Sequence, residues 1–214
     1  MELQLNNYHI KMLAAIWMVV DHVGAIFFPK IVLFRIIGRL SFPLFGWLLV
    51  QGERHTRNFN QYLIRLVVLG AISQPVYYLA LAGRQLNILF TLALGLILLR
   101  LSRRFANLQY LIWAGGMVAA QLVQVEYGAY GIALIGLFAK FRPHPVWWLA
   151  WIGLHLLILL KPGLGLLQLP AVATPLIIHL ANYHKGASAR WFYSFYPLHL
   201  LVLFLLSQLR TSGL

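Results

Sequence analysis

Long apolar runs separated by short polar breaks extend over the whole chain. The runs cover residues 10–28, 31–52, 62–81, 86–101, 109–123, 127–141, 146–160, 166–182 and 192–209. The breaks hold proline, glycine and charged residues, as at Pro29-Lys30 and Lys161-Pro-Gly163. A helix needs about 20 apolar residues to cross the hydrocarbon core of a bilayer. The pattern therefore predicts an all-α integral membrane protein, a polytopic bundle of about nine transmembrane helices in which several short middle segments are re-entrant or merged.

Composition agrees with this fold class. Of the 214 residues, 61% are hydrophobic and 10% are charged, and the mean hydropathy is +0.79. These values lie outside the usual range of a soluble domain. No Ser/Gly-rich linker or low-complexity tract divides the chain, so we expect one domain over residues 1–214. The first run is expected to remain a permanent span, because Asp21 and His22 interrupt it and no small-residue cleavage site follows.

The charge is strongly basic, with 17 Lys and Arg against four acids and a net charge of +13. The basic residues lie at the ends of apolar runs rather than on one soluble face, which favours contact with anionic membrane lipids over nucleic acid. With nine spans, most of them fall on the side of the N-terminus, which predicts a cytoplasmic N-terminus. The chain has no cysteine and no close helical set of histidines, so neither a disulfide nor a metal site is expected.

Asp21 and His22 are adjacent ionisable residues inside the first apolar run. Charged groups are costly in hydrocarbon and face a bundle interior or a cavity, so this pair needs partners or a chemical role. Arg35 and Arg39 are four residues apart in the second run, on one helix face and near the same level, so either can pair with Asp21. The ion pair of Asp21 with an arginine either locks two helices together or belongs to an active site, in which His22 accepts and returns a proton.

Further candidates are scattered through later runs. In the last run Tyr196 and His199 share a face, with Pro197 between them, and His199 is either a packing residue or a catalyst. Gln74 precedes Pro75, at which we expect the helix of the third run to kink. Asn87 begins the fourth run and either lines a cavity or caps a helix.

The loop after the second run is dense in hydrogen-bond donors, and it comprises Arg54, His55, Thr56, Arg57 and Asn58. Guanidinium groups bind phosphate oxygens in a two-pronged manner, so this loop, with Arg65, is a candidate phosphate site. The alternative is a positively charged membrane anchor in which Glu53 pairs with Arg57 at a spacing of four.

Several segments resemble the TraX family. The first two are Leu-Ala-Ala-Ile-Trp-Met-Val-Val-Asp-His-Val-Gly-Ala-Ile-Phe-Phe at 13–28 and Leu-Phe-Arg-Ile-Ile-Gly-Arg-Leu-Ser-Phe-Pro-Leu-Phe at 33–45. They are followed by Gln-Gly-Glu-Arg-His-Thr-Arg-Asn at 51–58, Tyr-Leu-Ile-Arg-Leu at 62–66, Ile-Ser-Gln-Pro at 72–75, Leu-Asn-Ile-Leu-Phe-Thr-Leu at 86–92, Tyr-Gly at 127–128 and Phe-Tyr-Pro-Leu-His-Leu-Leu at 195–201. The segments keep the family's order and reach nearly both ends of the chain.

The resemblance implies a bacterial inner-membrane enzyme. The family is named for a conjugation protein that acetylates the N-terminus of a pilus subunit, and it is similar to transmembrane acyltransferases that include the heparan-alpha-glucosaminide acetyltransferase and bacterial O-acyltransferases. It implies acyl-CoA, and acetyl-CoA above all, as donor on the cytoplasmic side. The acceptor is an amine or hydroxyl of a pilin-like protein, glycan or lipid on the other side, and a homo-oligomer is compatible with this.

The implied roles are specific. His22 is the base, Asp21 and Arg39 hold it in place, and His199 is a further catalytic candidate. Arg54, His55, Thr56, Arg57 and Arg65 bind the phosphates of CoA, with the Arg103-Arg104 pair as the alternative to Arg65. Arg35, Gln74, Asn87 and Tyr196 are the candidate substrate-binding and oxyanion-stabilising residues. From the residues alone, a small transporter or flippase with a path through Asp21, His22, Arg39 and His199 remains almost as well supported, and a non-catalytic scaffold is a third alternative.

Overall fold

The computed structural model describes residues 4–160, 165–187 and 191–211. The helices are α1 (Asn7–Phe27), α2 (Val32–Gly38), α3 (Ser41–His55), α4 (Phe59–Leu81), α5 (Ile88–Arg104), η1 (Ala106–Leu108), α6 (Gln109–Leu122), α7 (Gly128–Ala139), α8 (Pro145–Leu159), α9 (Gly165–Gln168), η2 (Leu169–Ala173), α10 (Thr174–His179) and α11 (Phe192–Thr211). Within these ranges extended pairing is limited to isolated bridges, so the all-α prediction is confirmed. The loop predicted at 161–163 lies outside the described residues.

Four helical segments of the described chain are long and apolar enough to cross a membrane: Asn7–Phe27, Val32–His55, Phe59–Leu81 and Phe192–Arg210. The other predicted runs are helical too, but their helices are shorter, such as the 12 residues of α7 and the 15 of α8. A polytopic membrane protein is therefore supported, and the count of nine spans stays a prediction.

The chain forms two compact units built from alternating stretches of sequence. Unit 1 comprises Met1–Phe45, Ile72–Arg84 and Pro170–Leu214, and unit 2 comprises Gly46–Ala71 and Gln85–Leu169. Both α3 and α4 contribute residues to each unit, so the units are not successive segments of the chain. The single domain expected from the sequence stays a prediction.

In unit 1, α1 and α2 form an antiparallel hairpin, and the predicted second span is broken. A helical capping box begins α1, with the Asn6 side chain accepting from the backbone N–H of His9 at 3.0 Å. The second span was expected to be continuous over 31–52, but α2 ends at Gly38 and α3 begins at Ser41. The cause lies in Pro43, which has no N–H to donate to the carbonyl of Arg39 and whose ring crowds that carbonyl.

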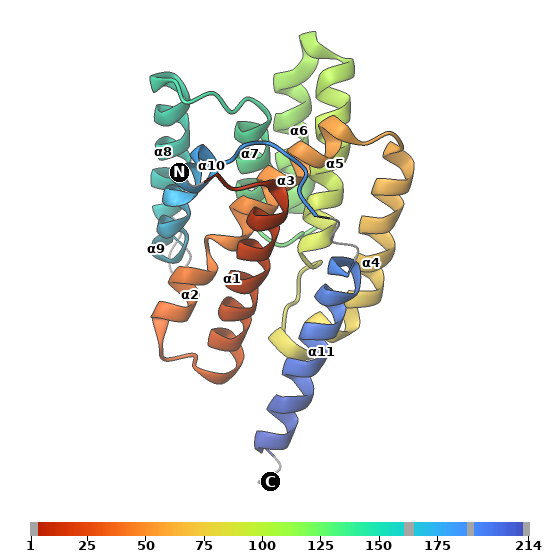
Figure 1. The fold of residues 1–214 in the computed structure, drawn as a ribbon, viewed down its shortest axis with the longest axis vertical. Helices are drawn as coiled ribbons and strands as arrows, with labels where there is room; N and C mark the ends of the chain where they lie inside the picture. Colours follow the sequence, from red (N-terminus) through yellow and green to blue (C-terminus); the bar gives the residue numbers. More distant parts are fainter. Residues whose placement is uncertain (1–3, 161–164, 188–190, 212–214) are drawn as a thin grey trace. The chain divides into compact units, whose positions relative to one another are not determined.

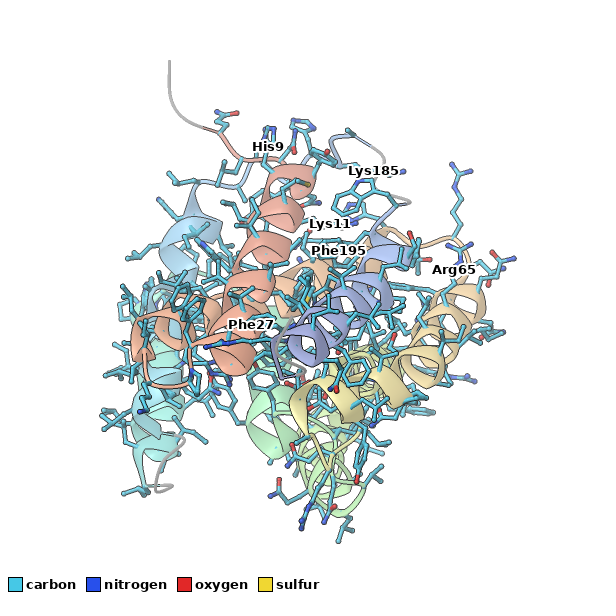
Figure 2. All side chains as sticks on the ribbon, turned by 90° about the horizontal axis from the view of Figure 1, so that it is seen from below. His9, Lys11, Phe27, Arg65, Lys185 and Phe195 are labelled. Carbon is cyan, nitrogen blue, oxygen red and sulfur yellow. The ribbon has the colours of Figure 1, made fainter. Side chains whose placement is uncertain are left out.

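Helix α11 runs parallel to α1 in the same unit (Figure 1). Lys11 Nζ lies 5.7 Å from the ring centre of Phe192, and Arg210 donates to the carbonyl of Phe27 at 3.0 Å, so residue numbers rise in the same direction along both helices. Figure 2 labels Lys11 and Phe27 towards the two ends of α1. If both helices cross the bilayer, they cross it in the same direction.

This parallel pair predicts the locations of the chain termini. Reporters fused before α1 and after α11 should be detected on opposite faces of the membrane, by thiol labelling or by a pair of cytoplasmic and extracytoplasmic reporter enzymes. The first three candidate spans leave the chain on the far side, so residues 82–191 must supply an odd number of crossings. Both reporters on one face would contradict the prediction, as would an even number of crossings in that segment.

Unit 2 has its own apolar core between α5, α6 and α7. Leu98, Ala120, Val125 and Ile132 are buried together, and partly buried hydrophobic side chains of the same helices pack around them. Asn87 caps α5 by accepting from the N–H of Leu89 at 3.1 Å. A second cluster consists of stacked and edge-to-face rings: Trp47, Phe138, Phe141, Trp147 and Trp151. Such packing fixes α3 and α5, the helices that carry Arg54 and Arg100.

Candidate active site

Two glycines allow α1 and α2 to approach closely in unit 1. A Cβ at Gly24 would lie 2.3 Å from the Cβ of Phe34, and a Cβ at Gly38 would lie 2.2 Å from the Cβ of Asp21. Real side chains do not meet at such distances, so both positions require glycine for this packing. Gly38 therefore brings the backbone of α2 against the carboxylate of Asp21.

The carboxylate of Asp21 forms ion pairs with both arginines of the second span. Arg39 donates from Nε to Oδ1 at 3.2 Å and from Nη2 to Oδ2 at 2.5 Å, in the two-pronged geometry that suits a carboxylate. Arg35 donates from Nη1 to Oδ2 at 2.8 Å and to the backbone carbonyl of Asp21 at 3.1 Å. The sequence predicted a pair with one arginine or the other, and the structure forms both. Asp21 and Arg39 are buried, whereas the Arg35 side chain is 27% exposed.

His22 is paired with His199 of α11. Nδ1 of His22 lies 2.9 Å from Nε2 of His199, and both side chains are buried. The ring planes differ by 6° and the ring centres are 5.1 Å apart, so the rings are nearly coplanar and are joined edge to edge by the N···N hydrogen bond. Among the described residues no hydrogen bond joins Asp21 to His22. The carboxylate is engaged by the arginines, and the ring of His22 contacts His199 instead, whereas the expected part of Asp21 and Arg39 in orienting the imidazole stays a prediction.

The neighbours of His199 on α11 are aromatic. The ring of Phe195 stacks on His199 with 5.0 Å between centres, and the ring of Tyr196 lies 5.5 Å away at an angle of 59°. Tyr196 is buried, whereas Phe195 is half-buried. Gln74 is half-buried beside Pro75 in α4, and its proposed part in binding substrate stays a prediction.

Asn87 has structural partners in unit 2. Its oxygen caps α5, its Nδ2 donates to the carbonyl of Gly70 at 2.8 Å, and the residue is fully buried. Thr91, one turn later, donates to the carbonyl of Glu126. These contacts favour the helix-capping alternative for Asn87.

The residues of the predicted phosphate site coincide only in part with a basic hollow that the structure forms. A hollow of about 760 Å³ in unit 2 is lined by Glu53, Arg54, Thr56, Phe59, Asn60, Arg100, Arg103 and Arg104. Of the predicted residues, Arg54, Thr56 and the alternative pair Arg103-Arg104 line it. His55, Arg57 and Arg65 are exposed residues that do not. Arg100 lies 4.6 Å from the ring centre of Phe59, an aromatic wall of the hollow. The site therefore draws on the C-terminal end of α5 as much as on the loop after α3.

Glu53 also departs from its predicted pairing. Its buried carboxylate receives Arg100 at 3.0 Å and Arg103 at 2.5 Å, rather than Arg57. A spacing of four places two side chains together only on a continuous helix, and α3 ends at His55. Glu53 holds two of the guanidiniums that face the hollow.

Glycine 38 provides a direct test of this geometry. Gly38→Ala should lower the free energy of unfolding by roughly 1–3 kcal/mol, because the new Cβ overlaps Asp21 and forces α1 and α2 apart. Thermal unfolding of the purified protein in detergent measures this change. The matched control is Gly153→Ala in α8, where nothing lies within 4 Å of the added Cβ and where alanine stabilises a helix by about 1 kcal/mol. Equal midpoints for the two variants would contradict the close approach.

Among the described residues no three His, Asp or Glu side chains are grouped as a metal ion requires. The histidine pair alone offers fewer ligands than a structural or catalytic zinc site uses.

Nearly the whole chain matches a known protein family. The family model described as TraX protein matches residues 6–207. The chain belongs to the TraX family. It is also 32% identical to the "Probable fimbrial assembly protein FimC, serogroup H1" of Dichelobacter nodosus, over 94% of this chain and 95% of that protein. No solved structure matches the chain.

Proposed function

We propose that this TraX-family protein is a membrane-embedded acyltransferase that moves an acetyl group from acetyl-CoA to an amine or hydroxyl. The observation that carries the proposal is the buried His22–His199 pair beside the Asp21–Arg39 ion pair. A histidine held in a fixed orientation is suited to general base and acid catalysis near neutral pH. The two guanidiniums on a single carboxylate supply positive charge where an oxyanion would develop.

The transfer balances without a further reactant. The acceptor nitrogen or oxygen attacks the thioester carbonyl while His22 takes the N–H or O–H proton. The C–S bond then breaks, the acetyl group stays on the acceptor, and the proton returns from His22 to the sulfur to give CoA thiol. Arg35, which is partly exposed, is the residue assigned to the oxyanion or to an anionic substrate group. A route through an acetylated His22 has the same overall balance.

The basic hollow of unit 2 is assigned to the phosphates of the donor. It collects four guanidiniums, of Arg54, Arg100, Arg103 and Arg104, against the one carboxylate of Glu53. Guanidinium is the side chain best shaped for phosphate oxygens. The two groups of residues are given separate tasks, and each is tested on its own.

The acceptor is proposed to be a pilin-like protein in a bacterial inner membrane. Support comes from the fimbrial assembly relative and from the family, since assembly of fimbriae requires handling of their subunits at the membrane. Four apolar helices of membrane-spanning length are in keeping with this location.

The deciding experiment uses the purified full chain in detergent with radiolabelled acetyl-CoA and a pilin N-terminal peptide. We expect saturable binding of acetyl-CoA and transfer of label to the peptide. Arg100→Ala/Arg104→Ala should weaken binding, whereas the control Arg65→Ala, outside the hollow, should not. A folded wild type that neither binds acetyl-CoA nor releases CoA thiol contradicts the proposal.

One observation favours a transporter as the second candidate. The span Val32–His55 is broken between Gly38 and Ser41, beside buried charges, and discontinuous helices form substrate sites in transporters. The same preparation discriminates the two functions, since a transporter moves its substrate across vesicles without consuming acetyl-CoA.

A further inference from the structure

The hydrogen bonds of the two buried histidines fix which ring nitrogens carry hydrogen. Nδ1 of His199 lies 2.9 Å from the backbone carbonyl of Phe195, one turn earlier on α11. A carbonyl oxygen only accepts, so Nδ1 of His199 must carry a hydrogen. In the neutral ring Nε2 then holds the lone pair.

This lone pair determines the state of His22. The N···N contact of 2.9 Å between Nε2 of His199 and Nδ1 of His22 needs one hydrogen, and His199 has none at Nε2, so it comes from Nδ1 of His22. The nearly coplanar rings have the alignment that such a bond needs. Neutral His22 therefore has its lone pair at Nε2, where no described residue makes a hydrogen bond to it.

The reverse arrangement, with His199 donating to His22, requires a doubly protonated His199. It would add a positive charge to a cluster in which Arg35 and Arg39 already share the single carboxylate of Asp21. Both guanidiniums act electrostatically on His22. The neutral pair with His22 as donor is the arrangement in keeping with these charges.

We infer that His199 is a positioning residue that sets the tautomer of His22, so that Nε2 of His22 is the nitrogen that takes the proton. This inference rests on the proposed function for its consequence in catalysis, but the tautomer itself is independent of any activity. When His22 receives the acceptor's proton at Nε2, its Nδ1–H bond to His199 strengthens, and the charge is shared without moving the hydrogen of His199. In hydrolases with a Ser-His-Asp triad a carboxylate orients the histidine, and here a neutral imidazole does so because Asp21 is engaged by arginines.

The test compares His199→Gln with His199→Leu in the full chain. The side-chain oxygen of glutamine can accept the Nδ1–H of His22 at about the place of Nε2, whereas leucine keeps the bulk and offers no acceptor. Nitrogen-15 NMR of labelled histidines reports directly which nitrogen of His22 is protonated. We expect the wild type and His199→Gln to show hydrogen on Nδ1 of His22, and His199→Leu to show a mixture of tautomers.

His155 is the internal control in the same spectra. Its Nδ1 faces the carbonyl of Trp151 at 2.8 Å and its Nε2 lies 3.1 Å from the hydroxyl of Tyr130, so its signals should not change in either variant. Transfer of acetyl from acetyl-CoA should fall roughly 10²- to 10⁴-fold in His199→Leu and remain within about 10-fold in His199→Gln.

The outcomes separate this inference from the proposed function. Hydrogen on Nε2 of His22 in the wild type, or an unchanged tautomer in a folded His199→Leu, overturns the inference whatever the activity. The predicted tautomers in a protein that never consumes acetyl-CoA support the positioning role and contradict the acyltransferase. Equal activity of the leucine and glutamine variants, with the tautomers as predicted, overturns the catalytic part of the inference.

Discussion

Asp21→Ala is expected to lower the free energy of unfolding by about 3–5 kcal/mol, a loss large enough to reduce the amount of folded protein in the membrane. The cause is the charge left behind. Arg39 is buried and donates two hydrogen bonds to Asp21, and without the carboxylate its guanidinium stays out of water and loses both bonds and the negative charge of Asp21. Thermal unfolding in detergent, followed by tryptophan fluorescence or circular dichroism, measures the effect.

A double variant separates charge from packing. Asp21→Leu combined with Arg39→Met replaces the buried pair by apolar side chains of similar volume, and such replacements are often neutral or stabilising. It should recover most of the lost stability while remaining inactive. The matched control is Glu126→Gln, in which one of the few other acids, half-buried in unit 2, is neutralised. A midpoint for Asp21→Ala equal to that of Glu126→Gln would mean that the ion pair contributes little.

The ion pair between Asp21 and Arg39 could be predicted from the sequence, because it depends on the geometry of two neighbouring helical segments. Asp21 lies on α1 and Arg39 is the C-cap residue of α2, the next helix after a tight turn, and residues at similar distances from such a turn meet. The position of Gly38 against Asp21 was missed, although a glycine inside an apolar helix next to a charge signals close backbone approach. The break after Gly38 was missed as well, although Pro43 signalled it.

The histidine pair was beyond the sequence for a physical reason. His22 and His199 are 177 residues apart, and their contact depends on which helix packs beside α1 and in which direction. Hydrophobic periodicity gives a helix its apolar face but not its neighbour. The sequence therefore offers His199 and His22 as separate candidates and does not pair them with each other.

The basic hollow of unit 2 could be predicted only in part from the sequence. A basic residue at a helix end orients the span in most membrane proteins, so the sequence does not distinguish Arg100 from the other basic residues at run ends. Only the fold brings Arg100 to the hollow beside Arg54, and only the end of α3 at His55 separates Glu53 from Arg57. Where a helix stops decides such pairings, and helix ends are the least certain part of a sequence-based prediction.

His22→Asn should reduce the transfer of acetyl from acetyl-CoA by roughly 10²- to 10⁴-fold, the range that a positioned general base supplies. The asparagine amide can still donate to Nε2 of His199 from about the place of Nδ1, so the contact between α1 and α11 is retained while the basic Nε2 is removed. Binding of acetyl-CoA should be unchanged, because the hollow of unit 2 is untouched. The measurement pairs equilibrium binding of labelled acetyl-CoA with release of CoA thiol.

The control for a buried histidine is His155→Asn in α8, whose ring also bonds to a carbonyl one turn earlier and is fully buried. Its loss should affect stability and leave the turnover of the folded fraction within about 10-fold, well short of the effect of losing a general base. If His22→Asn transfers acetyl groups as fast as the wild type, His22 is not the base. The Asp21–Arg39 pair then remains only as a lock between α1 and α2, since an ion pair of such burial can exist for structure alone. If both histidine variants lose turnover equally, the loss comes from general disruption, and rescue by added imidazole in His22→Asn alone becomes the decisive comparison.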